Sequence, residues 1–208
     1  NEEKQAYTDC LRDGGHSPVY SQQTQTAAYI SGVAAGDRAA RCRDIMQNPP
    51  EGFVKAGSPF FEFFLLEAYC REGKTQEMID TIRKDWGFMI DKGATTFWEM
   101  WSAEYGFGRL TRSHCHGWSA APTYFLSSYV LGIRPGGAGF KPVVIEPKPG
   151  DLKWARGVMP TPQGNVEVQW ENDPAQPFKL VINASEKINF IVNLPREGNV
   201  ILNGVEVS

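Results

Sequence analysis

A single carboxylate flanked by aromatic rings is the clearest candidate for chemistry in this sequence. Glu99 lies between Trp98 and Trp101, directly after a pair of threonines. Aromatic faces suit the C–H patches of a sugar, and a carboxylate can accept hydrogen bonds from its hydroxyls or act as a general acid or base. The alternative, that both tryptophans are core and Glu99 makes a structural hydrogen bond, fits the same residues.

A second polar cluster follows along the chain. It runs from Ser113 to Trp118 and contains His114 and His116. A histidine can hydrogen-bond a sugar hydroxyl, and an indole can stack on a sugar or pack in the core. If the fold brings this cluster to Glu99, the two segments together could form a carbohydrate site.

The other acids are weaker candidates. Glu104 follows the Glu99 segment and is the best second acid, although we expect it at the surface. The rest are predicted to be solvated or ion-paired groups: Asp85, Asp91, Glu62 and Glu67.

Composition excludes several classes of protein. The 208 residues carry a net charge of −3, with 41% hydrophobic and 22% charged residues, which predicts a globular protein and argues against a nucleic-acid footprint. No apolar run is long enough for a membrane span, and no phosphate-binding or metal-ligand motif occurs, so neither a cofactor nor a metal is expected. Four widely spaced cysteines do not indicate a zinc site.

The first residues give little indication of cellular location. Asn1 to Lys4 match no signal peptide, and there is no initiating methionine, so we expect a mature product or an excised fragment.

Helical patterns occupy the first part of the chain. Apolar spacing predicts helices over 1–13, 22–35, from Asp37 to the prolines at 49–50, 58–72, 75–86 and 119–131. The segment from Phe60 to Tyr69 is apolar nearly all round and is expected to be buried on most sides, with Phe60 to Phe64 in the core.

The pattern changes to period two after Pro135. Short strands are expected around 143–145, 166–170, 178–182, 188–192 and 200–207, and Asn203-Gly204 is a type I′ hairpin signal. The predicted fold class is therefore an α+β chain in two parts, a helical region over 1–134 and an antiparallel β-sandwich over 135–208.

Several motifs resemble those of one enzyme family. The segment from Gly93 to Glu99, the cluster from Ser113 to Ala120, and the stretches 129–133, 150–155 and 160–164 resemble, in order, motifs of bacterial α-L-rhamnosidases, the inverting enzymes of glycoside hydrolase family 78. The resemblance implies the last part of an (α/α)₆ barrel followed by the C-terminal β-sandwich.

The resemblance also implies roles for individual residues. Glu99 matches the general base, and His116 matches a histidine that binds the sugar, with His114 as the fallback. Trp98 and Trp118 fall within the same motifs. The family's general acid lies earlier in the barrel and has no counterpart here, so this chain alone is expected to be inactive. A glycoside substrate favours a periplasmic or secreted location.

Three hypotheses therefore remain open. The chain is part of a glycoside hydrolase acting on a rhamnoside, a non-catalytic carbohydrate-binding fragment, or a helical and β-sandwich interaction protein without a sugar site. A partial barrel also leaves apolar helix faces uncovered, so self-association of the isolated chain is expected.

Overall fold

The computed structural model describes residues 1–101 and 113–207. The chain divides into two compact units, one formed by residues 1–74 and 81–121 and the other by residues 75–80 and 122–208. The predicted succession of helices and then β-sheets is confirmed. The predicted boundary at residue 135 stays a prediction.

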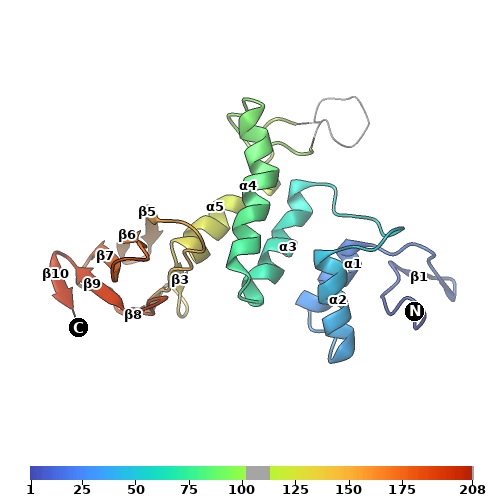
Figure 1. Ribbon diagram of the computed structural model, residues 1–208, viewed down its shortest axis with the longest axis horizontal. Coiled ribbons are helices and arrows are strands. Elements are labelled where there is room, and N and C mark those ends of the chain that lie inside the picture. Colours follow the sequence, from blue (N-terminus) through green and yellow to red (C-terminus); the bar gives the residue numbers. More distant parts are fainter. Residues whose placement is uncertain (102–112, 208) are drawn as a thin grey trace. The chain divides into compact units, whose positions relative to one another are not determined.

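Within the described residues, the helical unit holds four helices of two turns or more (Figure 1). They are α1 (Gln22–Ile30), α2 (Asp37–Gln47), α3 (Pro59–Arg71) and α4 (Thr75–Asp91), whose first residues, 75–80, belong to the second unit. Helix α3 begins as predicted, with Ser58 at the N-cap and Pro59 in the first turn, a position where proline loses no hydrogen bond. Helix α4 was predicted to end near Trp86, but it includes Gly87 and ends at Asp91.

The N-terminal segment does not form the predicted helix. It contains a two-stranded hairpin of β1 (Leu11–Arg12) and β2 (Gly15–His16). Asp13 and Gly14 both have positive φ, 51° and 77°, as a type I′ turn requires. The Asp-Gly pair therefore acts as a hairpin turn, whereas we expected it to end a helix.

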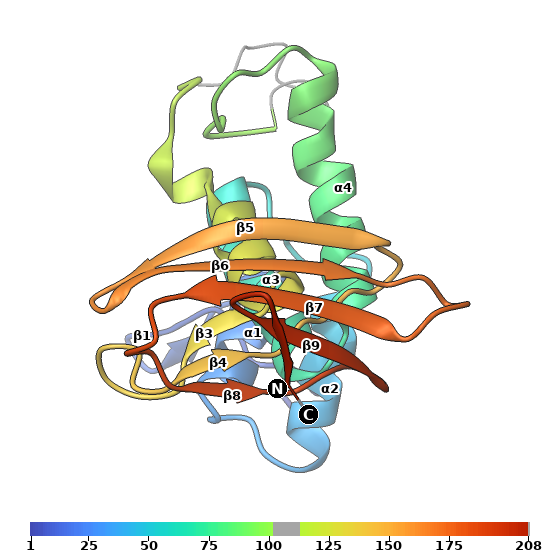
Figure 2. The same ribbon diagram turned by 90° about the vertical axis from the view of Figure 1, so that its left-hand side faces the viewer.

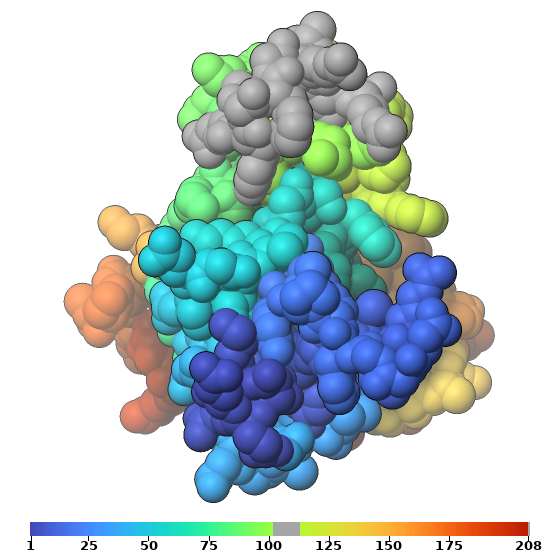
Figure 3. All heavy atoms as spheres, turned by 90° about the vertical axis from the view of Figure 1, so that its right-hand side faces the viewer, coloured from blue at the N-terminus to red at the C-terminus, as the bar shows by residue number. Residues whose placement is uncertain are grey.

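Two buried glutamines of α1 hold the surrounding chain in place. Gln25 accepts a hydrogen bond from Tyr7 N at 2.9 Å and donates to Tyr7 O at 2.7 Å. Gln22 donates to Met46 O and accepts from Ala56 N. Because each amide is paired with backbone groups, α1 can be polar and still lie in the interior. Figure 3 shows the face on which the N-terminal segment, in dark blue, lies against α2.

Three short helical pieces replace the single helix predicted over 119–131. A 3₁₀ turn (Gly117–Ser119) precedes α5 (Ala121–Phe125), and a π-helix (Leu126–Val130) follows. The π-helix ends at Val130, two residues before Gly132, whose φ is 90°.

The second unit contains two mixed sheets. The five-stranded sheet has the order β10-β9-β7-β6-β5, and the three-stranded sheet has the order β3-β4-β8 (Figure 2). The strands are β3 (Ile133–Pro135), β4 (Val143–Ile145), β5 (Trp154–Thr161), β6 (Gly164–Glu171), β7 (Phe178–Ala184), β8 (Phe190–Val192), β9 (Gly198–Leu202) and β10 (Val205–Val207).

We expected antiparallel sheets, but each of the two sheets contains one parallel pair of strands. Strand β7 pairs with β9 and β4 pairs with β8 in parallel. The reason is that β8 lies between β7 and β9 in the chain but joins the other sheet, so β9 returns to the first sheet in the direction of β7. The predicted hairpin turn is present, with positive φ at both Asn203 and Gly204.

The core of this unit contains alternate residues of its strands. On β6, Val166, Val168 and Trp170 are buried while the residues between them are exposed. Trp170 is fully buried, and its Nε1 donates to Val130 O at 3.1 Å, so the one polar atom of this large ring is paired.

Glu62 is a buried acid on α3. Only 7% of the residue is exposed, and its Oε2 has no hydrogen-bond partner among the residues that the structure describes. Burial, followed by the nearby Asp85 carboxylate, raises the pKa of Glu62 from 4.5 to about 7, and Lys84 opposes this shift. The expectation that Glu62 is solvated or ion-paired is therefore wrong.

This burial predicts a pH-dependent stability. A carboxyl whose pKa is higher in the folded state stabilises the fold fully below pH 4.5, and that contribution is lost as the pH rises to about 7, by roughly 3 kcal/mol. Glu62→Gln should remove this decline in urea unfolding at pH 4–8. Glu67→Gln, which alters an acid paired with Arg71 on the same helix, should retain it. An unchanged decline in Glu62→Gln would contradict the assignment.

Gly132 is predicted to be intolerant of a side chain. Its φ is 90°, and an added Cβ would lie 2.4 Å from backbone atoms of Glu146 and Pro147. Gly132→Ala should lower the unfolding free energy by about 2–4 kcal/mol through overlap and backbone strain. Gly87→Ala, on α4 with open space around the new methyl group, should instead raise it by about 0.5–1 kcal/mol. Equal effects of the two substitutions in chemical denaturation would show that the contact is not tight.

Candidate functional site

The Glu99 segment begins where α4 ends. Gly93 has φ of 79°, and its N–H donates to Ile90 O, while Ala94 N donates to Met89 O. A glycine in the left-handed region ends a helix in this way and redirects the chain. Residues 94–101 therefore leave α4 from a defined point.

Two backbone hydrogen bonds join the Glu99 segment to the histidine cluster. Glu99 N donates to Ser113 O at 2.9 Å, and His116 N donates to Phe97 O at 2.8 Å. The hydroxyl of Thr96 also donates to His114 O. The fold thus brings together two segments that the sequence only suggested were related.

The predicted site residues contact one another through their rings. Trp98 stacks on His114 with ring centroids 4.9 Å apart and an angle of 24° between the ring planes. His116 meets Trp118 edge to face at 6.0 Å. Glu99 is half-buried. A carboxylate, two imidazoles and two indoles therefore occupy one connected region of the helical unit.

Trp101 has a different environment from Trp98. It is 7% exposed and meets the buried Trp86 of α4 edge to face at 5.5 Å. Trp86 Nε1 in turn donates to Ser119 O at 2.8 Å. Trp101 is therefore a core residue that anchors the segment, and of the two tryptophans beside Glu99 only Trp98 is open to solvent.

Sequence reasoning missed Phe60. Phe60 and Phe64 are 42% and 38% exposed, so assigning both to the core was wrong. The Phe60 ring lies 4.9 Å from that of Trp118, which is 70% exposed. The helical phase of α3 contained the signal, because a face defined by buried Leu65, Leu66 and Tyr69 places Phe60 and Phe64 on the opposite side.

The other acids named above lie elsewhere in the helical unit. Glu67 pairs with Arg71 at 2.9 Å, Asp85 lies 3.3 Å from Lys84, and Asp91 is exposed. Glu104 lies outside the described residues.

The remaining side chains that could do chemistry are metal ligands and cysteine thiols. Within residues 1–101 and 113–207, no group of three or more His, Cys, Asp or Glu side chains is placed to hold a metal ion. The four cysteines lie in these ranges, and none of them forms a disulfide. In the same residues, no helix combines the length and apolar character that a membrane span needs.

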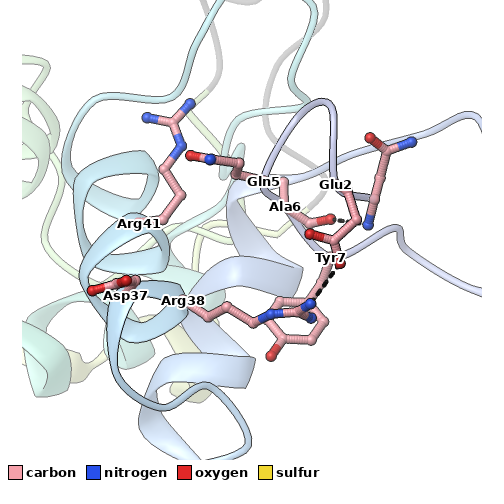
Figure 4. Close-up of a pocket in the computed structure, with 8 residues that line it drawn as sticks. Glu2, Gln5, Ala6, Tyr7, Asp37, Arg38 and Arg41 are labelled. Carbon is pink, nitrogen blue, oxygen red and sulfur yellow. Dashed lines mark hydrogen bonds and ion pairs between the residues drawn. The ribbon is translucent and has the colours of Figure 1, made fainter.

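A separate cavity of about 230 Å³ lies between the N-terminal segment and α2 (Figure 4). Arg38 reaches across it and donates to Glu2 at 2.7 Å, while Arg41 extends from the same helix. None of the predicted site residues lines this cavity. The cavity is therefore separate from the region around Glu99.

Comparison with known proteins assigns both parts of the chain. Residues 17–130 match the bacterial alpha-L-rhamnosidase 6 hairpin glycosidase domain, and residues 132–208 match the bacterial alpha-L-rhamnosidase C-terminal domain. An alpha-L-rhamnosidase of Alteromonas sp. (strain LOR) is 33% identical over 130 residues, which are 57% of this chain and 13% of the relative.

Solved structures agree with this assignment. The GH78 family rhamnosidase of Bacillus sp. GL1 is 47% identical with a TM-score of 0.89, over 97% of this chain and 22% of that protein. The Streptomyces avermitilis alpha-L-rhamnosidase, solved in complex with L-rhamnose, shares the fold at 23% identity and a TM-score of 0.62, over 82% of this chain and 17% of that one. This chain spans less than a quarter of each of these relatives. It belongs to the bacterial α-L-rhamnosidases of glycoside hydrolase family 78, of which it spans part of the six-hairpin glycosidase domain and the C-terminal domain.

Proposed function

We propose that this chain supplies the general base and a sugar-binding histidine for the inverting hydrolysis of terminal α-L-rhamnosyl linkages. The full-length gene product that contains these residues would be the active enzyme. The observation that carries the proposal is the backbone pairing of residues 97–99 with residues 113–116, which places Glu99 and His116 in one region. Membership of the rhamnosidase family supports a rhamnoside as the substrate.

Inverting hydrolysis assigns Glu99 a specific task. The reaction needs two carboxyl groups about 6.5–9.5 Å apart, one to protonate the leaving oxygen and one to take a proton from the attacking water. Glu99 would be the second of these. Water would then attack the anomeric carbon on the face opposite the leaving group, and the product would have the inverted configuration. The general acid would come from residues outside this chain.

The surrounding rings suit such a substrate. The exposed side of Trp98, fixed by stacking on His114, offers a flat apolar face, and His116 offers a hydrogen-bonding nitrogen. Together they can orient a rhamnosyl ring, which carries both C–H patches and hydroxyls.

A second function is a non-catalytic carbohydrate-binding fragment. It is favoured by the lack of a counterpart to the family's general acid motif within these 208 residues. Calorimetry of the 208-residue chain with L-rhamnose, together with an assay for rhamnose release, would distinguish the two. If the 208-residue chain binds L-rhamnose but the full-length gene product releases none, the carbohydrate-binding hypothesis is favoured. If neither protein binds L-rhamnose, an interaction protein is favoured.

Glu99→Gln tests the catalytic assignment. The amide keeps the shape but cannot accept the proton from water, so kcat of the full-length enzyme on an aryl α-L-rhamnoside should fall by about 10²–10⁴-fold, with L-rhamnose binding largely retained. The product anomer of the wild-type reaction, read by NMR, should be inverted. Glu77→Gln, which alters an exposed acid on α4, is the matched control. A kcat near that of wild type for Glu99→Gln would leave Glu99 a structural acid.

His116→Ala tests sugar recognition. Loss of one polar contact should weaken binding of L-rhamnose, measured as a competitive inhibitor, by about 1–3 kcal/mol, with a smaller effect on kcat. His114→Ala is the comparison, because the fold stacks that ring on Trp98. A larger loss of affinity in His114→Ala than in His116→Ala would transfer the role to His114.

A further inference from the structure

Two exposed rings from different elements form an aromatic platform beside the proposed site. We define the platform as Phe60, in the first turn of α3, and Trp118, in the 3₁₀ turn. Their ring centroids are 4.9 Å apart, and the ring planes are tilted by 33°. Phe64 supports Phe60 edge to face at 6.0 Å. Large apolar side chains as exposed as these, gathered in one patch, are typical of a binding surface.

The platform is fixed in place from both sides. Phe60 follows Pro59, which is buried at the start of α3. Trp118 precedes Ser119, which is fully buried and whose carbonyl accepts the hydrogen bond from Trp86. Both rings therefore project from anchored backbone, and a ligand that stacks on them would need little reorganisation of the chain.

The backbone pairing places the platform away from the proposed base. Glu99 pairs with Ser113 and Phe97 pairs with His116, so Trp118 lies beyond His116 at the end of the paired segments opposite Glu99. His116, which meets Trp118 edge to face, lies between the two. The order along the site is therefore the base, then the sugar-binding histidine, then the platform.

The inverting mechanism predicts which part of the substrate lies near each end of this order. The base delivers water to one face of the anomeric carbon, and the leaving group departs from the other. We propose that Phe60 and Trp118 form a stacking surface for the ring of the leaving group, which is either the C–H face of a second sugar or the plane of an aryl group. This inference rests on the proposed rhamnosidase function, and it makes the two residues determinants of specificity for the leaving-group side.

The test compares substrates that differ only in the leaving group. α-L-Rhamnosyl fluoride has no ring to stack, whereas 4-nitrophenyl α-L-rhamnoside and a rhamnosyl-glucose disaccharide each offer one. In the full-length enzyme, Phe60→Ala should lower kcat/KM for the ring-bearing substrates about 3–10-fold more than for the fluoride, mainly through KM. The more affected of the two substrates identifies whether a sugar or an aryl ring is preferred.

Matched variants separate stacking from folding. Phe60→Tyr keeps a ring and should restore most of the selectivity, whereas Phe60→Leu keeps apolar bulk and should not. Trp118→Ala should repeat the pattern of Phe60→Ala. Trp154→Ala, which removes a comparably exposed indole from β5, should leave the ratio between substrates unchanged.

Each remaining outcome is decisive. Equal losses on all three substrates would overturn the inference, because the platform would then support the fold or the rhamnosyl ring. Wild-type kinetics in both Phe60→Ala and Trp118→Ala would show that the platform does not contact substrate. If the wild-type enzyme releases rhamnose from none of the substrates, including the fluoride, the proposed function itself fails and the inference fails with it.

Discussion

The buried indole of Trp86 holds the candidate site together. Its ring receives Trp101 edge to face, and its Nε1 donates to Ser119 O at 2.8 Å. Trp101 ends the Glu99 segment, and Ser119 directly follows the histidine cluster. One side chain of α4 therefore anchors both segments, and the two backbone hydrogen bonds between them set their register. The positions of Glu99 and His116 depend on this anchor together with the two backbone hydrogen bonds.

The aromatic residues of the helical unit divide into two populations. Trp86 and Trp101 are buried and provide cohesion, while Trp98, Trp118 and Phe60 keep part of their rings open. The division separates two physical roles, because a ring enclosed by the protein cannot also stack on a ligand. Each open ring contacts another ring, and this contact restricts its conformation although the ring is exposed.

Sequence periodicity predicted most elements but not the local chemistry within them. The strand alternation of 166–170 and the start of α3 at Ser58-Pro59 are determined by nearby residues, and both predictions are confirmed. The N-terminal hairpin was missed because Asp-Gly serves equally as a helix end and as a type I′ turn, and only tertiary contacts, such as those of Gln25 with Tyr7, select one of them.

The candidate site was predicted as residue types but not as an arrangement. Sequence motifs indicated Glu99, Trp98 and the histidines, whereas the partnership of Phe60 with Trp118 depends on how α3 meets the 3₁₀ turn, which no local pattern encodes. Glu62 was misjudged for a similar reason. An acid in an apolar helix is normally turned outward, but here the outward face carries Phe60 and Phe64, and Glu62 is buried.

The location of the candidate residues separates positioning from specificity. Glu99 and His116 lie in connecting segments, whose backbone is fixed by the Trp86 anchor and the paired hydrogen bonds. The Phe60 ring projects from a different element, α3, and touches these segments through Trp118. A substitution at Phe60 therefore changes the surface offered to a ligand and leaves the Trp86 anchor and the two backbone hydrogen bonds in place. Selectivity for the leaving group can then vary while the proposed base keeps its place.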